Sequence, residues 1–283
     1  MQRHCGQGEA PHATKCTAHP RPAHLGTLDA VNTRCQKPDM DAAEYALMDA
    51  VEDGMWWYRA LRARIVAALE RRPGGPGPLL DAGCGTGGMV AALLAAGIVR
   101  PMVAFDYVAE AAQRARAKTN LPIAVGDITR QPYADATFGA AVSLDVLSHS
   151  SVEPPAALAE LHRVLAPGGT LILNLPAHEW LKSAHDARVH NARRFTAAGI
   201  RSLLEAAGFT AIEARYWNTL LLPLMVIQRK ILARNPEGAS DVAPFPPWLN
   251  VSLHGVTVAE HWLARRGLRF PAGGSVLVAA TRP

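Results

Sequence analysis

Apolar residues along this 283-residue chain alternate between short continuous runs and helical repeats. Such runs, each ending at a polar residue, are typical of buried strands, and apolar residues spaced three or four apart are typical of helices. The predicted strands run to Asp81 and over Met102–Phe105, Ile123–Val125, Gly139–Leu144 and Thr170–Leu175, and the predicted helices cover Gly88–Ala96, Ala109–Lys118 and Pro155–Leu165. This order predicts an α/β fold with a doubly wound, mostly parallel sheet whose two faces are both covered.

The C-terminal third extends this sheet and adds a helical segment. Thr196–Ala207 is an amphipathic helix, and the strands Ala211–Tyr216 and Ser275–Ala280 bring the predicted sheet to seven strands. Between them, at about 217–266, lies an apolar run broken by Pro223 and a further helical pattern. The run is too short to span a bilayer, so we expect a helical cover inserted over the site; an interfacial membrane helix is the alternative.

Residues 40–72 predict an N-terminal helical arm of two helices interrupted at Gly54. The adjacent aromatics Trp56, Trp57 and Tyr58 fall on different helix faces, so they cannot all pack into one core. They serve either to anchor the arm or to form a lid over a bound ligand. A Pro- and Gly-rich linker follows, and a main domain over 78–283 is expected after it.

Residues 1–39 lack apolar periodicity and are rich in His, Pro, Gly, Thr and Cys, which predicts a disordered extension with Met40 as the functional start. Their Cys and His spacings match no paired-ligand pattern, so no metal site is expected.

The net charge and the hydropathy pattern limit the classes of binding partner that we expect. The net charge is +5, but no stripe of basic and aromatic residues indicates nucleic-acid binding. Neither a signal-peptide core nor a membrane span is present in the pattern, which predicts a cytoplasmic protein without stable membrane insertion, although peripheral contact stays open. Neither pattern bears on the oligomeric state.

A glycine-rich loop follows the first predicted strand. The segment from Gly83 to Gly88 satisfies GxGxxG, which dinucleotide enzymes and methyltransferases share. The acidic residues around the loop distinguish these two classes of enzyme better than the glycines do. Asp81 precedes the loop, and Asp106 and Asp127 end the next two strands. Three acids and no basic residue favour a ligand without phosphates, because a pyrophosphate would be repelled.

Several motifs together resemble the class I S-adenosylmethionine-dependent methyltransferases, in the bacterial branch that acts mainly on small molecules. The resemblance covers about residues 41–283. It rests on LLDAGCGTGG, on AFD ending at Asp106, on VGDI around Asp127, on SLDVLSH from Ser143 to His149, and on ELHRVLAPGGTLILNLPA from Glu160 to Ala177. It implies a Rossmann-like methyltransferase fold and S-adenosyl-L-methionine as the cofactor.

The resemblance also implies roles for matched positions. Gly83, Cys84 and Gly85 would pass under the methionine moiety, with Asp81 near its ammonium group. Asp106 would hold the ribose hydroxyls. Tyr107 would lie against the adenine, and Asp127 with the Ile128 backbone N–H would bind the adenine edge. Leu144 would lie beside the sulfonium.

Catalytic candidates are fewer. Methyl transfer needs a general base only when the acceptor must lose a proton, and His149, four residues past Asp145, is the first candidate. A surface or capping role for His149 is the alternative. The polar segment with His185, Asp186 and His190 either pins a loop by hydrogen bonds or contacts the acceptor; its histidines are five residues apart, unlike the zinc-helix spacing.

The expected function is methyl transfer to an O, N or C nucleophile of a small, partly apolar molecule, with His149, His185 and Tyr58 as the catalytic candidates. An NAD(P)-dependent oxidoreductase and a non-catalytic S-adenosylmethionine-binding regulatory module are the alternatives.

Overall fold

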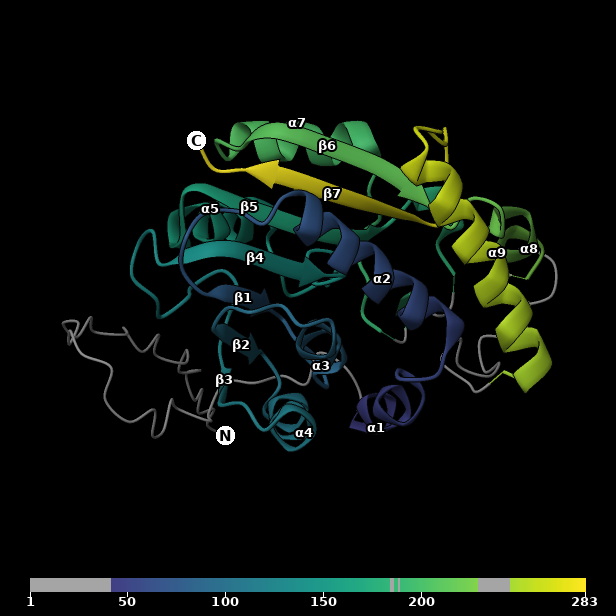
Figure 1. Ribbon diagram of the computed structural model, residues 1–283, viewed down its shortest axis with the longest axis horizontal. Helices are drawn as coiled ribbons and strands as arrows, with labels where there is room; N and C mark the ends of the chain where they lie inside the picture. The colour runs from purple at the N-terminus through teal and green to yellow at the C-terminus, as the bar shows by residue number, and fades with distance from the viewer. Residues whose placement is uncertain (1–41, 184–185, 188, 229–244) are drawn as a thin grey trace, which may run out of the picture. The chain divides into compact units, whose positions relative to one another are not determined.

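The computed structural model describes residues 42–183, 186–187, 189–228 and 245–283. Its centre is a seven-stranded sheet in the order β3-β2-β1-β4-β5-β7-β6 (Figure 1). The strands are β1 (Leu79–Ala82), β2 (Met102–Asp106), β3 (Ile123–Val125), β4 (Phe138–Leu144), β5 (Leu165–Pro176), β6 (Thr210–Trp217) and β7 (Ser275–Thr281). β7 is antiparallel to both its neighbours, and the other pairings are parallel. The predicted mostly parallel sheet of seven strands is therefore confirmed.

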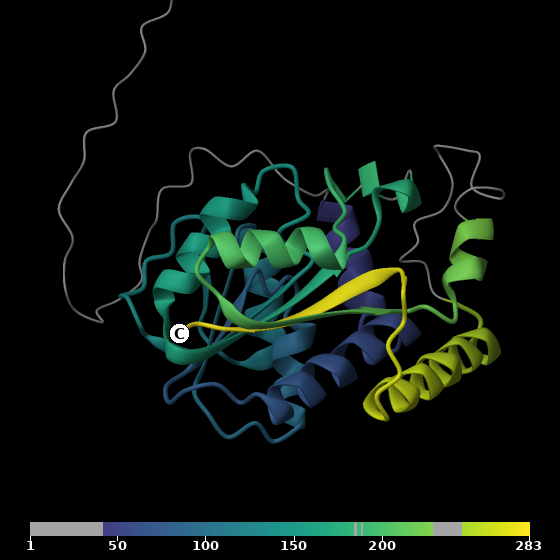
Figure 2. The same ribbon diagram turned by 90° about the horizontal axis from the view of Figure 1, so that it is seen from above.

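Helices cover both faces, which explains why the strands are apolar at consecutive positions. Leu79 packs in one cluster with residues of α2 (Trp56–Arg71) and α3 (Gly88–Ala95), whereas the adjacent Leu80 packs with α5 (Pro154–Val164) and α7 (Ala197–Ala206) on the other face. Figure 2 shows α5 and α7 on one side of the sheet and α2 on the other. The helix α4 (Ala109–Thr119) packs beside α3 through Ala112 and Ala115.

Two N-terminal helices were predicted, and both are present. The helix α1 (Ala42–Val51) ends before Gly54, and α2 begins at Trp56. At the other end of the chain, the helices α8 (Leu222–Val226) and α9 (Pro247–Arg265) are inserted between β6 and β7. α2 and α9 pack together, with Trp56 against Leu221 and Leu253. None of the described helices has the length and apolarity needed to cross a membrane.

One boundary differs from expectation. The helix predicted to reach Leu165 ends at Val164, and β5 begins at Leu165 rather than at Thr170. Leu165 already pairs with Phe138, and the next pair joins Thr170 to Ala140, so residues 166–169 bulge out of the ladder. Arg282 closes this bulge, because its N–H donates to the Gly169 carbonyl at 2.9 Å and its carbonyl accepts from Gly168 at 2.8 Å. A Pro-Gly-Gly sequence reads as a turn, and such a bulge is not visible from the sequence.

The topology gathers seven strand ends at one edge. β1, β2, β3, β4, β5 and β6 all end there, and the antiparallel β7 begins there, with Ser275 beside both Pro176 and Trp217. Ligands of open α/β sheets bind at this edge.

Candidate active site

The loop after β1 is held by close backbone contacts. The N–H groups of Gly83 and Cys84 both donate to the Phe105 carbonyl, at 2.9 and 3.0 Å. Gly83 has φ 85°, and a Cβ there would lie 2.4 Å from a Val146 methyl group. Only glycine fits this position, because any side chain would clash and would also disfavour the left-handed backbone.

Asp81 is buried beside this loop, and none of the described residues is its hydrogen-bond partner. The side chain is 1% exposed, and neither carboxylate oxygen is hydrogen-bonded by any described residue. Burial, with smaller contributions from Asp106 and Glu52, raises the pKa of Asp81 to about 8. A buried acid with two unused oxygens that lines a cavity fits a cationic ligand group such as an ammonium.

Asp106, at the end of β2, is tied to the loop. Its Oδ2 accepts from the Gly85 N–H at 2.8 Å, and its Oδ1 accepts from the Val108 N–H at 2.9 Å. Burial raises the pKa of Asp106, while these backbone bonds act in the opposite direction. Each carboxylate oxygen can accept a second hydrogen bond, so the group remains able to bind hydroxyls.

Asp127 follows β3 and is exposed. Its Oδ1 accepts from the N–H of Thr129 at 2.8 Å and from the Thr129 hydroxyl at 2.7 Å, which fixes the carboxylate. The neighbouring Ile128 is buried. The Cys84 thiol is buried as well, and burial raises its pKa.

One cavity brings the predicted residues together. Its volume is about 420 Å³, within the usual size of ligand sites. Its lining includes all nine predicted cofactor residues: Asp81, Gly83, Cys84, Gly85, Asp106, Tyr107, Asp127, Ile128 and Leu144. The catalytic candidates His149 and Tyr58 line the same cavity. The third, His185, lies outside the described residues.

Asp145, to which no role was predicted from the sequence, also lines the cavity. It follows β4 with φ 59°, and both its carboxylate oxygens accept from the Asn174 amide, at 3.0 and 3.1 Å. Burial raises the pKa of Asp145 to about 7, against the lowering effect of Asn174 and Arg194. Its place at a strand end, shared with Asp106, was the signal that could have identified it.

Arg194 is a second cavity residue without a predicted role. It is 8% exposed, and its Nε and Nη2 donate to the two carboxylate oxygens of Asp186 at 3.0 and 2.9 Å. Its Nη1 donates to the Ala177 carbonyl at 3.1 Å. Asp186 is fully buried, so this pair ties the polar segment after β5 to the strand end.

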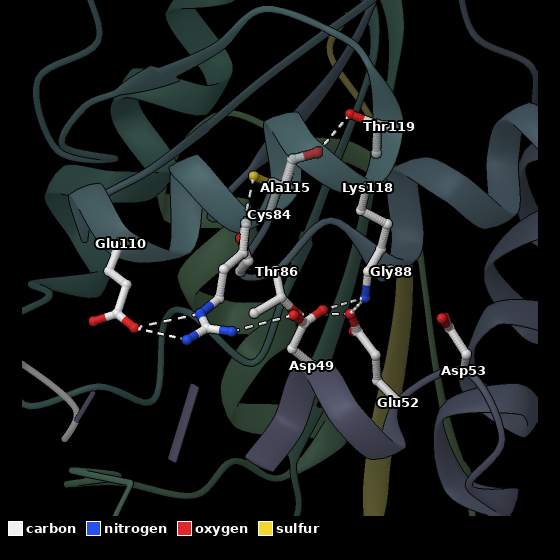
Figure 3. A network of polar contacts seen from close by, with 12 residues as sticks. Asp49, Glu52, Asp53, Cys84, Thr86, Gly88, Glu110, Ala115, Lys118 and Thr119 are labelled. Atoms are coloured by element: carbon white, nitrogen blue, oxygen red, sulfur yellow. Dashed lines mark hydrogen bonds and ion pairs between the residues drawn. The ribbon is translucent and has the colours of Figure 1, made fainter. Parts of the chain in front are cut away.

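The N-terminal arm is fastened to the glycine loop by a network of charges (Figure 3). Glu52 accepts from the Thr86 hydroxyl at 2.6 Å and pairs with Lys118 of α4. Lys118 also pairs with Asp49 at 2.6 Å. A Cβ at Gly88 would lie 2.2 Å from a Glu52 oxygen, so the arm can approach the start of α3 only because that residue is glycine. No role in fastening the arm was predicted for Glu52 from the sequence.

Comparisons with known proteins agree with this geometry. Residues 80–173 match the family model described as a methyltransferase domain. The chain is 37% identical over 163 residues to a malonyl-[acyl-carrier protein] O-methyltransferase of Erwinia pyrifoliae, covering 54% of this chain and 59% of that protein. It is 29% identical over 213 residues to a demethylmenaquinone methyltransferase of Mycolicibacterium vanbaalenii, covering 72% of this chain and 84% of that protein.

Among solved structures, an S-adenosylmethionine-dependent methyltransferase of Thermotoga maritima, described as a possible histamine N-methyltransferase, has the same fold. The TM-score is 0.55 at 18% identity, covering 85% of this chain and 96% of that one. The alignments with three of the curated relatives span only 35%, 48% and 59% of their lengths. Residues 80–173 therefore carry a methyltransferase domain, and the family model, the sheet order and the glycine loop agree on S-adenosylmethionine as its cofactor.

Proposed function

We propose that the protein transfers the methyl group of S-adenosylmethionine to an oxygen, nitrogen or carbon nucleophile of a small, partly apolar molecule. One observation carries the proposal: the same cavity is lined by the acids and glycines that follow β1, β2 and β3 and by His149, Asp145 and aromatic residues. We assign the first group to a cofactor end and the second to an acceptor end. A cofactor site and an acceptor site in one space are what direct transfer requires.

In this proposal the residues after β1, β2 and β3 hold the cofactor. Asp81 faces the ammonium group, which would supply the missing partner of its buried carboxylate. Asp106 binds the ribose hydroxyls, and Asp127 with the Ile128 N–H binds the adenine edge. Gly83, Cys84 and Gly85 lie under the methionine moiety, Tyr107 lies against the adenine, and Leu144 borders the sulfur.

The bound cofactor supplies an electrophilic methyl group on a positively charged sulfur, which keeps the electron pair of the broken bond and leaves as a neutral thioether. The protein therefore has to align the acceptor and exclude water. The described parts of the arm (42–72) and of the insertion (217–228 and 245–266) serve as covers in this proposal, since Trp56, Met225 and Phe245 line the cavity.

An acceptor hydroxyl or ammonium must also lose a proton. His149 and Asp145 both line the acceptor end, and we propose them as the groups that accept it. In this proposal Tyr58 contacts the acceptor and takes no proton from it. Tyr58 lines the cavity, and its ring packs edge-on against that of Trp57, with centroids 5.1 Å apart.

The test is transfer of a labelled methyl group from the cofactor into fractions of a host-cell extract, followed by mass identification of the labelled product. We expect label in a small organic molecule. Cofactor binding without transfer to any fraction would instead support the regulatory module. Tight NAD binding without S-adenosylmethionine binding would support the oxidoreductase.

A further inference from the structure

The acceptor end of the cavity holds two buried polar atoms that no described residue satisfies. Asn218 is 1% exposed and its Oδ1 has no hydrogen-bond donor. Trp56 is 8% exposed and its Nε1 has no acceptor. Both side chains line the cavity, and buried polar groups without partners are rare in native proteins. A bound molecule that supplies the missing donor and acceptor explains both.

Among the described residues, the Asn218 side chain has a partner for its Nδ2 and none for its Oδ1. It follows β6 with φ 58°, and its backbone N–H donates to Glu260 at 2.7 Å. Its Nδ2 donates to the Met225 sulfur at 3.2 Å, which orients the amide because a thioether can only accept. Glu260 is itself buried and paired with Arg64 at 3.2 Å, so the support is rigid.

Trp56 belongs to the same part of the cavity. Its backbone N–H donates to Asn250 of α9 at 2.8 Å, and its ring packs on Leu221, three residues after Asn218. Met225, which contacts the Asn218 amide, and Phe245 add apolar walls here. The surroundings are therefore apolar, and among the described residues they leave one buried acceptor atom and one buried donor atom of the cavity lining without a partner.

Charge at this end disfavours an anionic acceptor. The carboxylate of Asp145 lines the cavity, and the Arg194 guanidinium is occupied by Asp186 and the Ala177 carbonyl. A carboxylate or phosphate brought next to Asn218 Oδ1 would meet lone pairs and could not donate a hydrogen bond. A hydroxyl or an amine would instead give that oxygen the hydrogen it lacks.

Resting on the proposed function, we infer that the acceptor is a largely apolar molecule bearing a hydroxyl or amine group that donates to Asn218 Oδ1, with a further oxygen or nitrogen that accepts from Trp56 Nε1. Carboxylic acids of the same size are excluded. Asn218 and Trp56 thus determine specificity.

A matched series of naphthalenes tests this by calorimetric titration of the whole protein, with and without saturating S-adenosylhomocysteine. We expect 2-naphthol and 2-naphthylamine to bind about tenfold more tightly than 2-methoxynaphthalene or 2-naphthoate, because only the first two donate a hydrogen bond. Equal binding of the naphthoate, or no binding by any of the four, would overturn the inference.

Two substitutions of Asn218 separate recognition by its side chain from a backbone role, and one of Trp56 tests the second hydrogen bond. Asn218→Gly keeps the left-handed backbone but removes the amide, and we expect the preference for naphthol over methoxynaphthalene to disappear. Asn218→Asp keeps an accepting oxygen and should retain it. Trp56→Phe should weaken 2,6-dihydroxynaphthalene more than 2-naphthol. A wild-type preference in Asn218→Gly would overturn the inference.

Failure of this inference and failure of the proposed function give different results. If S-adenosylhomocysteine fails to bind, the proposed function fails. The preference for naphthol can still be measured in the titrations without S-adenosylhomocysteine. If S-adenosylhomocysteine binds and no preference appears, this inference alone fails.

Discussion

The two ends of the cavity are built in different ways. At the cofactor end, two of the three acids accept from a backbone N–H two residues further along the chain: Asp106 from Val108, and Asp127 from Thr129. At the acceptor end, the contacts join residues far apart in sequence: Asp145 meets Asn174, and Asn218 meets Glu260. The first end is a short local motif repeated at successive strands, whereas the second exists only once the whole chain has folded.

Because the two ends are built from different contacts, we expect that substitutions can alter one end without altering the other. Substitutions at the acceptor end should change turnover or acceptor binding and leave cofactor affinity intact, and substitutions at the cofactor end should do the reverse. A residue whose substitution changed turnover and cofactor affinity equally would have to act on both ends of the cavity.

The largest expected effect is on turnover. His149→Ala should lower kcat on the order of 100-fold, the usual contribution of a general base. Cofactor affinity, measured by titration, should stay within about twofold. A wild-type rate would remove His149 as the base, and lost cofactor affinity would place it at the other end.

Asp106→Ala should weaken cofactor binding by roughly 1.5–3 kcal/mol, about 10- to 150-fold, because charge-assisted hydrogen bonds to the ribose are lost. Calorimetric titration measures this directly. Unchanged affinity would mean that the end of β2 does not contact the cofactor.

Asp145 gives the acceptor end a pH dependence. Its pKa is raised to about 7, so its carboxylate is mostly protonated at pH 6 and mostly ionised at pH 8. If the ionised form assists the reaction, kcat/KM rises about tenfold per pH unit below 7 and levels off above it. Asp145→Asn should abolish this rise; an unchanged profile in that variant would exclude Asp145.

The smallest expected effect concerns the arm. Glu52→Gln should weaken cofactor binding about three- to tenfold, because the pairing that fastens α1 and α2 over the glycine loop is reduced. Asp53→Asn is the matched control: Asp53 pairs with Arg62 at 3.1 Å but is 68% exposed, so its removal should have little effect. Equal effects of the two substitutions would contradict a specific role for Glu52.

The sequence predicted the first end of the cavity far better than the second. Strand-end acids and a glycine loop are local signals, and every cofactor residue they indicated lines the cavity. The strands were predicted because apolar runs between polar ends leave few alternatives. Asp145 was missed as a site residue, although it followed the same strand-end rule.

Asn218, Arg194 and Glu52 could not be recognised in this way. Their significance comes from partners in distant elements, such as Glu260, Asp186 and Thr86, and no local spacing encodes those contacts. The bulge of residues 166–169 was missed for the same reason, since Arg282 at the end of the chain closes it.

Asp81 offers the most direct test of the cofactor end. With a pKa of about 8 in the free protein, it is mostly protonated at pH 7. It must ionise to pair with an ammonium group, so cofactor binding should release close to one proton at pH 7. Calorimetric titration with S-adenosylmethionine in two buffers of different ionisation enthalpy measures this release. We expect tight binding with that release, lost in Asp81→Asn; a buffer-independent enthalpy, or binding of NAD in place of S-adenosylmethionine, would contradict it.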